Sequence, residues 1–202
     1  MYERILFRAL GLPAVYRTFG RIVAGDGRGI LARDHIRARD GQRVLDIGCG
    51  PADILTELPN VDYTGFDANP AYIASAKRNH GNRGRFYCQR VNEEALGKHS
   101  GFDIVLAIGV VHHLDDDEAE KLFRLAHSAL APGGRLVTLD GCYVAGQPRI
   151  ARFLLSRDRG SHVRNQAGYV GLASRVFTSV DAVVRGDLLA VPYTNLILEC
   201  QR

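Results

Sequence analysis

Residues 44–52 read Val-Leu-Asp-Ile-Gly-Cys-Gly-Pro-Ala, and Gly-Phe-Asp follows at residues 65–67. This pattern predicts a buried strand that ends in an acidic residue, a glycine-rich turn, and a second strand that ends in another carboxylate. Gly48 and Gly50 let the backbone turn sharply and approach a ligand closely, because they have no Cβ. Asp67 stands where an acidic residue can accept hydrogen bonds from both hydroxyls of a ribose. The stretch therefore favours a ligand that contains a nucleoside.

The spacing of the loop distinguishes between such ligands. A dinucleotide-binding loop has a third glycine three residues after the second, where this chain has Asp53. That loop holds a pyrophosphate on backbone amides, and the carboxylates of Asp46 and Asp53 would repel its charge. The same carboxylates favour S-adenosylmethionine, which carries a sulfonium and an ammonium group and no phosphate. A strand-to-helix turn that binds nothing is the alternative.

These residues resemble the class I, seven-stranded S-adenosylmethionine-dependent methyltransferases, whose first motif has the form V-L-D-x-G-x-G-x-G. Ala52 stands where the third glycine usually lies, and we expect it to take an early helical position. Further matches are the fourth-strand motif F-D-x-V at 102–105, the v-l-H-H-l segment at 110–114, and the L-x-P-G-G-x-L turn at 130–136. The resemblance covers about residues 40–140 well and implies S-adenosyl-L-methionine as the cofactor.

Strand and helix patterns alternate along the chain, which predicts a parallel sheet with right-handed crossovers. The expected strands are 43–47, 61–66, 85–89, 102–107 and 134–140, and the expected helices are 52–58, 70–79 and 115–131. After residue 140, a linker and helix precede two strand-like runs at 177–189 and 193–201. The resemblance implies that these two runs form an antiparallel hairpin.

We therefore expect an α/β fold with a Rossmann-like, mostly parallel seven-stranded sheet, a C-terminal antiparallel hairpin and an N-terminal helical lid. The chain is interpreted as a single methyltransferase domain over residues 1–202. Its expected parts are an N-terminal helical cap at 1–39, a cofactor-binding core at 40–140, and a substrate-side segment with the hairpin at 141–202.

The composition is that of an ordinary globular domain, with 202 residues, 46% hydrophobic and 24% charged residues and a net charge of +4. No apolar run approaches the roughly 20 residues that span a bilayer. The start of the chain lacks a secretory pattern, and the four scattered cysteines suit free thiols, so we expect a cytoplasmic protein. The mild basic excess permits an anionic acceptor, but no dense basic patch favours nucleic acid.

Two histidines follow the expected fourth strand, and an acid ends the fifth. Because both positions open on the same edge of the sheet, the imidazole of His112 or His113 could meet the Asp140 carboxylate. A hydroxyl acceptor needs a base with a pKa near neutrality, so we predict a catalytic role here, with His113 ranked ahead of His112. The resemblance agrees, since some sugar and natural-product O-methyltransferases have a histidine and an acid at these positions. Alternatively, one histidine packs beneath the cofactor and the other caps a helix.

The remaining predicted contacts concern the cofactor, and the resemblance implies them. Asn92 stands in place of an aspartate that recognises the adenine. A side-chain amide at this position can still accept and donate hydrogen bonds. Arg21 is a candidate for the methionine carboxylate, with Tyr16 and Arg17 beside it. The full predicted cofactor-binding set is Asp46, Gly48, Gly50, Asp67, Ala68, Asn92, Ile108 and Arg21.

The acids at 115–118 follow the histidines and also suit a metal. Acids at a helix start interact favourably with the dipole and cap free amides, so we predict capping and no metal. The segment from Gly141 to Arg164 contains five arginines, which could bind a carboxylate or phosphate on the acceptor. A solvated helix face is the alternative for this segment.

The sequence thus predicts S-adenosylmethionine-dependent methyl transfer to a small-molecule acceptor, with oxygen as the acceptor atom. An RNA methyltransferase is one alternative, although 107–110 lack an N-P-P-Y-type motif. A non-catalytic cofactor-binding scaffold is another, supported by Ala52 and Asn92. The basic amphipathic pattern near the N-terminus predicts a lid over the cofactor; a membrane-surface role, with a lipid-linked acceptor, is the other reading.

Overall fold

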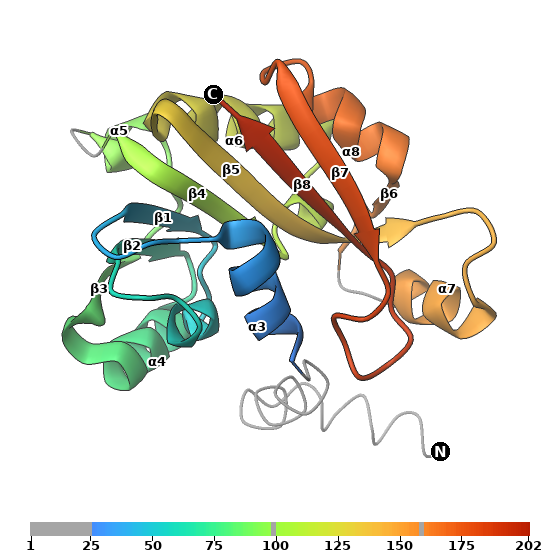
Figure 1. Cartoon of the computed structure of the whole chain (residues 1–202), viewed down its shortest axis with the longest axis horizontal. Helices are drawn as coiled ribbons and strands as arrows, with labels where there is room; N and C mark the ends of the chain where they lie inside the picture. The colour runs from blue at the N-terminus through green and yellow to red at the C-terminus, as the bar shows by residue number, and fades with distance from the viewer. Residues whose placement is uncertain (1–25, 98–99, 158–159) are drawn as a thin grey trace.

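The computed structural model describes residues 26–97, 100–157 and 160–202 (Figure 1). These residues form a sheet in the order β3-β2-β1-β4-β5-β8-β7, and the short strand β6 pairs with β5 off this path. Strands β1 to β5 pair in parallel, whereas β8 is antiparallel to both β5 and β7. The strands are β1 (Arg43–Ile47), β2 (Asp62–Asp67), β3 (Gly84–Cys88), β4 (Phe102–Ile108), β5 (Leu130–Tyr143), β6 (Arg164–Asn165), β7 (Ser179–Arg185) and β8 (Asn195–Gln201). The predicted Rossmann-like sheet and C-terminal hairpin are confirmed.

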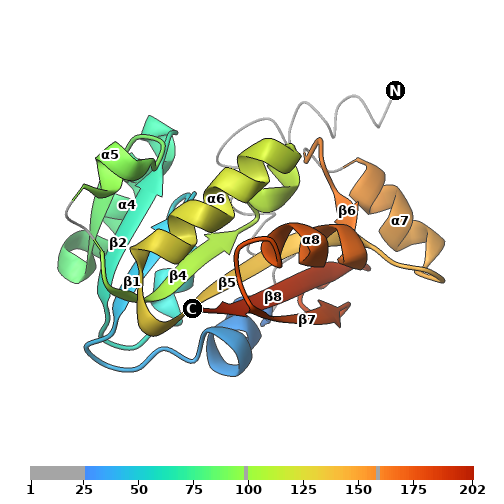
Figure 2. The ribbon, with the colours of Figure 1, turned by 90° about the horizontal axis from the view of Figure 1, so that it is seen from above.

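Helices cover both faces of the sheet (Figure 2). On one face lie α5 (Glu93–Leu96), α6 (Asp116–Ala129) and α8 (Gln166–Ala173). On the other face lie the π-helix η1 (Leu31–Ile36), which continues α3 (Gly27–Ile30), the 3-10 helix η2 (Asp53–Thr56) and α4 (Pro70–His80). The remaining elements are η3 (Gly81–Arg83), η4 (Val111–His113) and α7 (Arg149–Ser156).

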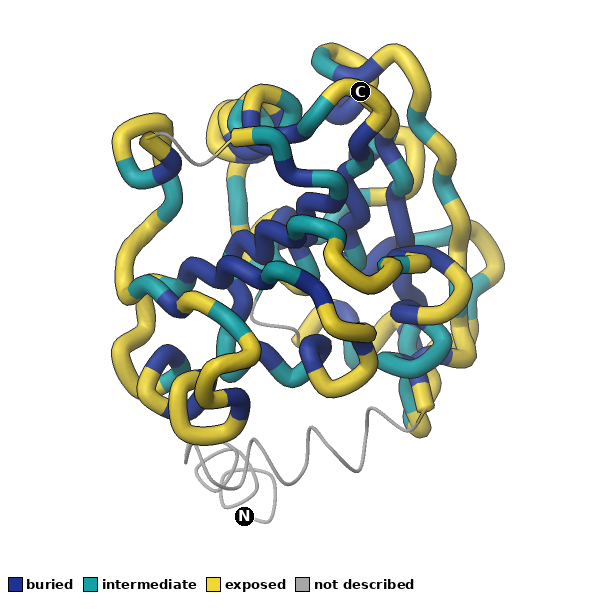
Figure 3. The backbone as a smooth tube through the Cα atoms, turned by 60° about the vertical axis from the view of Figure 1, so that its left-hand side comes forward, coloured by how far each residue is buried: buried dark blue, intermediate teal, exposed yellow. Residues whose placement is uncertain are grey.

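The central strand β4 is buried on both faces. Ile104 and Leu106 pack into the layer of η1 and α4, whereas Val105 and Ala107 pack into the layer of α6 and α8. A strand with both faces covered reads as a continuous apolar run rather than an alternating one, and residues 104–108 do so. Figure 3 shows this buried band running through the centre of the molecule. The core thus fixes the strand ends, whose carboxyl edges carry the site.

The loop after β1 departs from the prediction at one residue. Ala52 has φ 57° and ψ 36°, so it is left-handed and does not take the expected early helical position. Gly48 and Gly50 also have positive φ, at 72° and 54°, so three residues of this turn lie on the left-handed side of backbone space. A non-glycine residue in this conformation costs about 1–2 kcal/mol. The predicted helix at 52–58 is accordingly a single 3-10 turn, η2.

Other differences are in length. β5 extends well beyond the predicted 134–140, and the short helix α5 was not predicted. The Asp115 side chain accepts a hydrogen bond from the Glu118 amide at 2.8 Å, so the predicted capping of α6 is confirmed. Residues 1–25, which include Arg21 and most of the predicted N-terminal cap at 1–39, lie outside the described residues, and α3 and η1 lie in the remaining part of that cap. Within the described ranges, no helix combines the length and the apolar character needed to cross a membrane.

Candidate cofactor and acceptor site

The glycine-rich loop is held to the end of β2 by backbone and carboxylate hydrogen bonds. The Gly48 amide donates to the Phe66 carbonyl at 2.8 Å, and the Gly50 amide donates to Asp67 Oδ2 at 2.9 Å. Asp67 Oδ1 accepts from the Asn69 amide at 2.7 Å. A Cβ on Gly48 would lie 2.7 Å from the Val110 side chain, whereas one on Gly50 would meet no atom within 4 Å. The backbone at Gly50 is therefore open to a ligand.

Asp46 is a buried carboxylate with one oxygen unpaired. Its side chain is at the end of β1, and the residue is 2% exposed. Oδ2 accepts a hydrogen bond from the Tyr63 hydroxyl at 2.5 Å, but Oδ1 has no partner among the described residues. Burial raises the pKa of Asp46 to about 7; the hydrogen bond from Tyr63 opposes this rise, and the nearby Asp67 carboxylate adds to it. An unpaired buried oxygen is costly, so the site suits a cationic ligand group.

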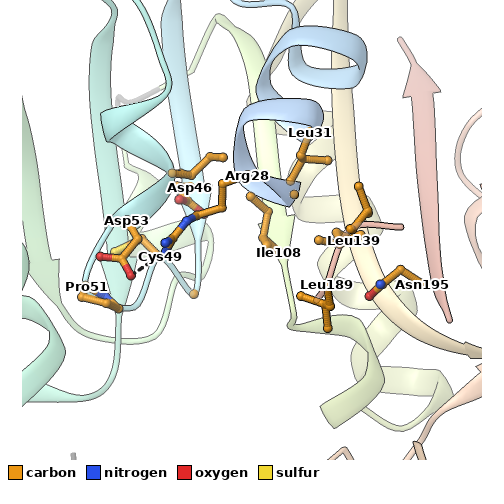
Figure 4. Close-up of a pocket in the computed structure, with 14 residues that line it drawn as sticks. Arg28, Leu31, Asp46, Cys49, Pro51, Asp53, Ile108, Leu139, Leu189 and Asn195 are labelled. Atoms are coloured by element: carbon orange, nitrogen blue, oxygen red, sulfur yellow. Dashed lines mark hydrogen bonds and ion pairs between the residues drawn. The ribbon is translucent and has the colours of Figure 1, made fainter. Parts of the chain in front are cut away.

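A cavity of about 210 Å³ opens beside Asp46 at the carboxyl edge of the sheet (Figure 4). Arg28 and Asp53 lie at the Asp46 end, and Leu139 and Asn195 lie at the other end, with Ile108 between them. The complete lining is Gly27, Arg28, Leu31, Asp46, Gly48, Cys49, Pro51, Asp53, Ile54, Ile108, Leu139, Leu188, Leu189 and Asn195. One end of the cavity is thus charged and the other mostly apolar.

Arg28 was not predicted from the sequence. Its guanidinium forms an ion pair with Asp53 at 2.9 Å, so the negative charge of Asp53 is compensated within the protein. The start of α3 packs closely on the loop before β8, because a Cβ on Gly27 would lie 1.8 Å from the Leu188 carbonyl oxygen. The glycines at 27 and 29 that flank Arg28 were the available signal. They mark a helix whose backbone approaches other chain segments.

Asn195 is a second residue that the sequence did not point to. It begins β8, where it pairs with Gly141 of β5 and with Arg185 of β7. The residue is buried and lines the cavity, and its Nδ2 has no hydrogen-bond partner within the described part of the chain. The amide therefore offers an unused donor at the apolar end of the cavity.

The structure brings together His112 and Asp140. The His112 Nδ1 lies 2.8 Å from Asp140 Oδ1, and the His112 amide donates to the same oxygen at 3.1 Å. Both residues are buried; His112 lies in η4 after β4, and Asp140 lies within β5, which continues to Tyr143 beyond the predicted strand end at 140. His113 is exposed, and its ring centroid lies 4.2 Å from that of His112. The carboxylate thus contacts His112, whereas His113 was ranked first from the sequence.

The surroundings of this pair limit access to it. Gly160 packs against the imidazole, since a Cβ there would lie 2.1 Å from His112 Cδ2. The His162 amide donates to the His112 carbonyl at 2.9 Å. Neither His112 nor Asp140 is among the residues that line the cavity, although Leu139 is. The pair therefore lies beside the cavity rather than in its wall.

The other predicted cofactor residues follow the second and third strands. Asn92 is exposed and caps α5, because its Oδ1 accepts a hydrogen bond from the Ala95 amide at 2.6 Å. Ala68 is exposed beside Asp67. The adenine contact of Asn92 stays a prediction, with its oxygen already engaged in the cap.

The acidic start of α6 carries structural contacts. Asp116 forms an ion pair with Arg164 at 2.6 Å. In the described ranges, no group of three or more histidine, cysteine, aspartate or glutamate residues has an arrangement suited to a metal ion. All four cysteines are free.

Comparison with known proteins adds to this geometry. Residues 45–136 match a family model described as a methyltransferase domain. The ubiquinone biosynthesis O-methyltransferase of a Bradyrhizobium strain is 38% identical over 104 residues, which are 48% of this chain and 39% of that protein. The probable tRNA methyltransferase 9B of Mus musculus is 31% identical over 100 residues, which are 49% of this chain and 22% of that protein. The chain thus spans well under two thirds of these relatives.

A solved structure shows the same fold. The S-adenosylmethionine-dependent methyltransferase from Methanosarcina mazei superimposes with a TM-score of 0.66 at 19% identity, covering 83% of this chain and 95% of that chain. The sheet order and the loop after β1 thus agree with the matched domain. Residues 45–136 match a methyltransferase domain, and the chain has the fold of solved S-adenosylmethionine-dependent methyltransferases.

Proposed function

We propose that this protein transfers a methyl group from S-adenosylmethionine to an oxygen atom of a small-molecule acceptor. The observation that carries the proposal is the unpaired Oδ1 of Asp46 in the wall of the cavity. This oxygen lacks a cationic partner, and the ammonium group of S-adenosylmethionine supplies one. The family match supports the methyl donor, and the similarity to an O-methyltransferase supports oxygen as the acceptor atom.

The residues present fit the cofactor. Asp46 would hold the ammonium, Asp67 the ribose hydroxyls, and Arg28 the carboxylate, for which it would leave its ion pair with Asp53. When bound, S-adenosylmethionine supplies a methyl group already activated by a positively charged sulfur. The protein is then left to orient the acceptor and to remove its proton.

His112 is the base in this proposal. In this proposal Asp140 accepts from Nδ1, Nε2 takes the proton of an acceptor hydroxyl, and the carboxylate stabilises the resulting imidazolium. The segment at Gly160 would have to give way for an acceptor to reach the ring. Asn195 would donate a hydrogen bond from Nδ2 to an oxygen of the acceptor. His113 remains the alternative base.

The test has two stages. Calorimetry with S-adenosylhomocysteine measures binding to the wild-type protein and to Asp46→Asn, and we expect tighter binding by the wild type. Transfer from radiolabelled S-adenosylmethionine is then measured on a panel of phenols, hydroxy acids, sugars, amines and unmodified tRNA. Transfer to hydroxyl compounds supports the proposal. Transfer to amines or tRNA alone overturns the acceptor assignment, and binding without any transfer favours the scaffold alternative.

A further inference from the structure

Helix α7 lies directly after β5, at the acceptor end of the site (Figure 1). Its buried residues are Ala151 and Leu155. Leu155 packs against Gly141, where a Cβ would lie 2.7 Å from Leu155 Cδ2. Gly141 follows Asp140, the partner of His112. One side of α7 therefore anchors it beside the proposed catalytic pair.

The outer side of α7 is apolar and exposed. Ile150 is 62% exposed and Phe153 is 54% exposed, which makes them the most exposed large hydrophobic residues in the described part of the chain. Residues three positions apart in a helix lie on the same face, so these side chains form one apolar patch. In the described part of the chain this patch stays exposed.

Arginines surround the patch. Arg149, Arg152 and Arg157 are all exposed, and the guanidinium of Arg157 lies 5.2 Å from the centroid of the Phe153 ring. The Arg152 guanidinium lies 5.4 Å from the centroid of the Tyr143 ring. The sequence from 141 to 157 contains no aspartate or glutamate. Cationic side chains beside exposed aromatic and aliphatic side chains are typical of helices that lie at a lipid interface.

We propose that the α7 surface, formed by Arg149, Ile150, Arg152, Phe153 and Arg157, docks on an anionic lipid bilayer. The arginines match the negative surface, and Ile150 and Phe153 enter the headgroup region. A protein partner fits less well, because one face of an eight-residue helix is far smaller than the roughly 800 Å² per partner of a stable interface. If the proposed methyl transfer is correct, docking brings the acceptor end of the site to the lipid surface, which suits an amphiphilic acceptor.

The test is sedimentation of the full chain with vesicles, without cofactor. We expect binding to phosphatidylcholine vesicles that contain about one third phosphatidylglycerol, weakening as salt rises, and little binding to pure phosphatidylcholine. Binding that is equal for both vesicle types, or absent from both, would overturn the proposal.

Three double variants sharpen this test. Arg149→Gln/Arg152→Gln should lower the partition coefficient roughly 25-fold, at about 5-fold per arginine. Ile150→Ser/Phe153→Ser should lower it about 10-fold or more. Lys77→Gln/Arg78→Gln on α4, at the far end of the sheet from α7, removes the same charge and should change binding less than about 5-fold.

Two further outcomes separate the possible failures. If the α7 variants bind vesicles as well as the wild type, α7 is not the docking surface. Calorimetry with S-adenosylhomocysteine should give unchanged affinity for the α7 variants. Loss of vesicle binding with intact cofactor binding therefore supports docking, whether or not methyl transfer to a hydroxyl is ever observed.

Discussion

At the β1 end of the cavity, the hydrogen bonds to Asp46 and Asp67 join residues of one strand–loop–strand unit, and only the Arg28–Asp53 ion pair described here brings in another segment; at the β5 end the contacts join separate segments. The Tyr63–Asp46 and Gly50–Asp67 hydrogen bonds each connect residues 17 positions apart within one strand–loop–strand unit. The His112–Asp140 contact spans 28 positions and joins η4 to β5. Asn195 reaches the cavity from the antiparallel strand β8. The donor end is thus built mainly from a local motif, with Arg28 added from α3, and the acceptor end depends on tertiary packing.

The largest expected effect tests the acceptor end. His112→Ala should lower turnover by about 10²–10⁴-fold, because the base is lost, while cofactor affinity stays nearly unchanged. Asp140→Asn should lower turnover in the same direction, since it no longer stabilises the imidazolium. His113→Ala is the matched control and should cost less than about 10-fold. A larger loss in His113→Ala than in His112→Ala would restore the order expected from the sequence.

The next effect concerns the donor end and pH. Asp46 has a pKa of about 7 when folded and an ordinary value of 3.8, so between these values the folded state binds a proton that the unfolded state does not. The contribution of Asp46 to stability is therefore present at low pH and is lost as pH rises toward 7. We expect a loss of a few kcal/mol, because each tenfold change in the proton affinity of a carboxylate is worth about 1.4 kcal/mol. Urea unfolding from pH 4 to 8 measures this loss of stability, and Asp46→Asn should lack the part of the pH dependence that comes from Asp46. An identical pH slope in both proteins would refute the assignment.

Asp67 provides a smaller effect at the same end. Asp67→Ala should weaken S-adenosylmethionine binding by about 1–3 kcal/mol, because the ribose loses a charged acceptor and the Gly50 amide loses its partner. Asp62→Ala is a suitable control, since Asp62 begins the same strand at the opposite edge. Calorimetry should show unchanged affinity for the control. Equal affinity for both variants would mean that Asp67 does not contact the cofactor.

The smallest effect concerns Asn92, which lies outside the cavity lining. Asn92→Ala should lower stability by about 1 kcal/mol, because α5 loses its cap, whereas Asn92→Asp should keep it. Urea unfolding measures both variants. If the alanine variant keeps full stability but loses cofactor affinity, the residue acts in adenine recognition rather than as a cap.

The sequence predicts the residues of the local strand–loop–strand motif better than the residues that distant segments bring to the cavity. Asp46, Gly48 and Ile108, three of the residues predicted to bind the cofactor, line the cavity, and they could be found because strand ends and glycine turns are local signals. Asn195 was not predicted because nothing in its own neighbourhood shows that β8 starts beside β5. Arg28 was missed because its ion pair with Asp53 joins segments 25 positions apart. The left-handed Ala52 was misread because alanine also suits a helix start, and only the winding of the loop decides its conformation.

The close packing of Gly27 on the Leu188 carbonyl links the two ends of the cavity mechanically. Arg28, the next residue of α3, lies at the donor end, whereas Leu189, the neighbour of Leu188, lies at the acceptor end (Figure 4). Any movement of α3 that accompanies the departure of Arg28 from Asp53 would be transmitted to the loop before β8 through this contact. Occupancy of one end then alters affinity at the other by the same factor in both directions. We therefore expect the two substrates to bind with coupled affinities, and a side chain in place of Gly27 to disturb both.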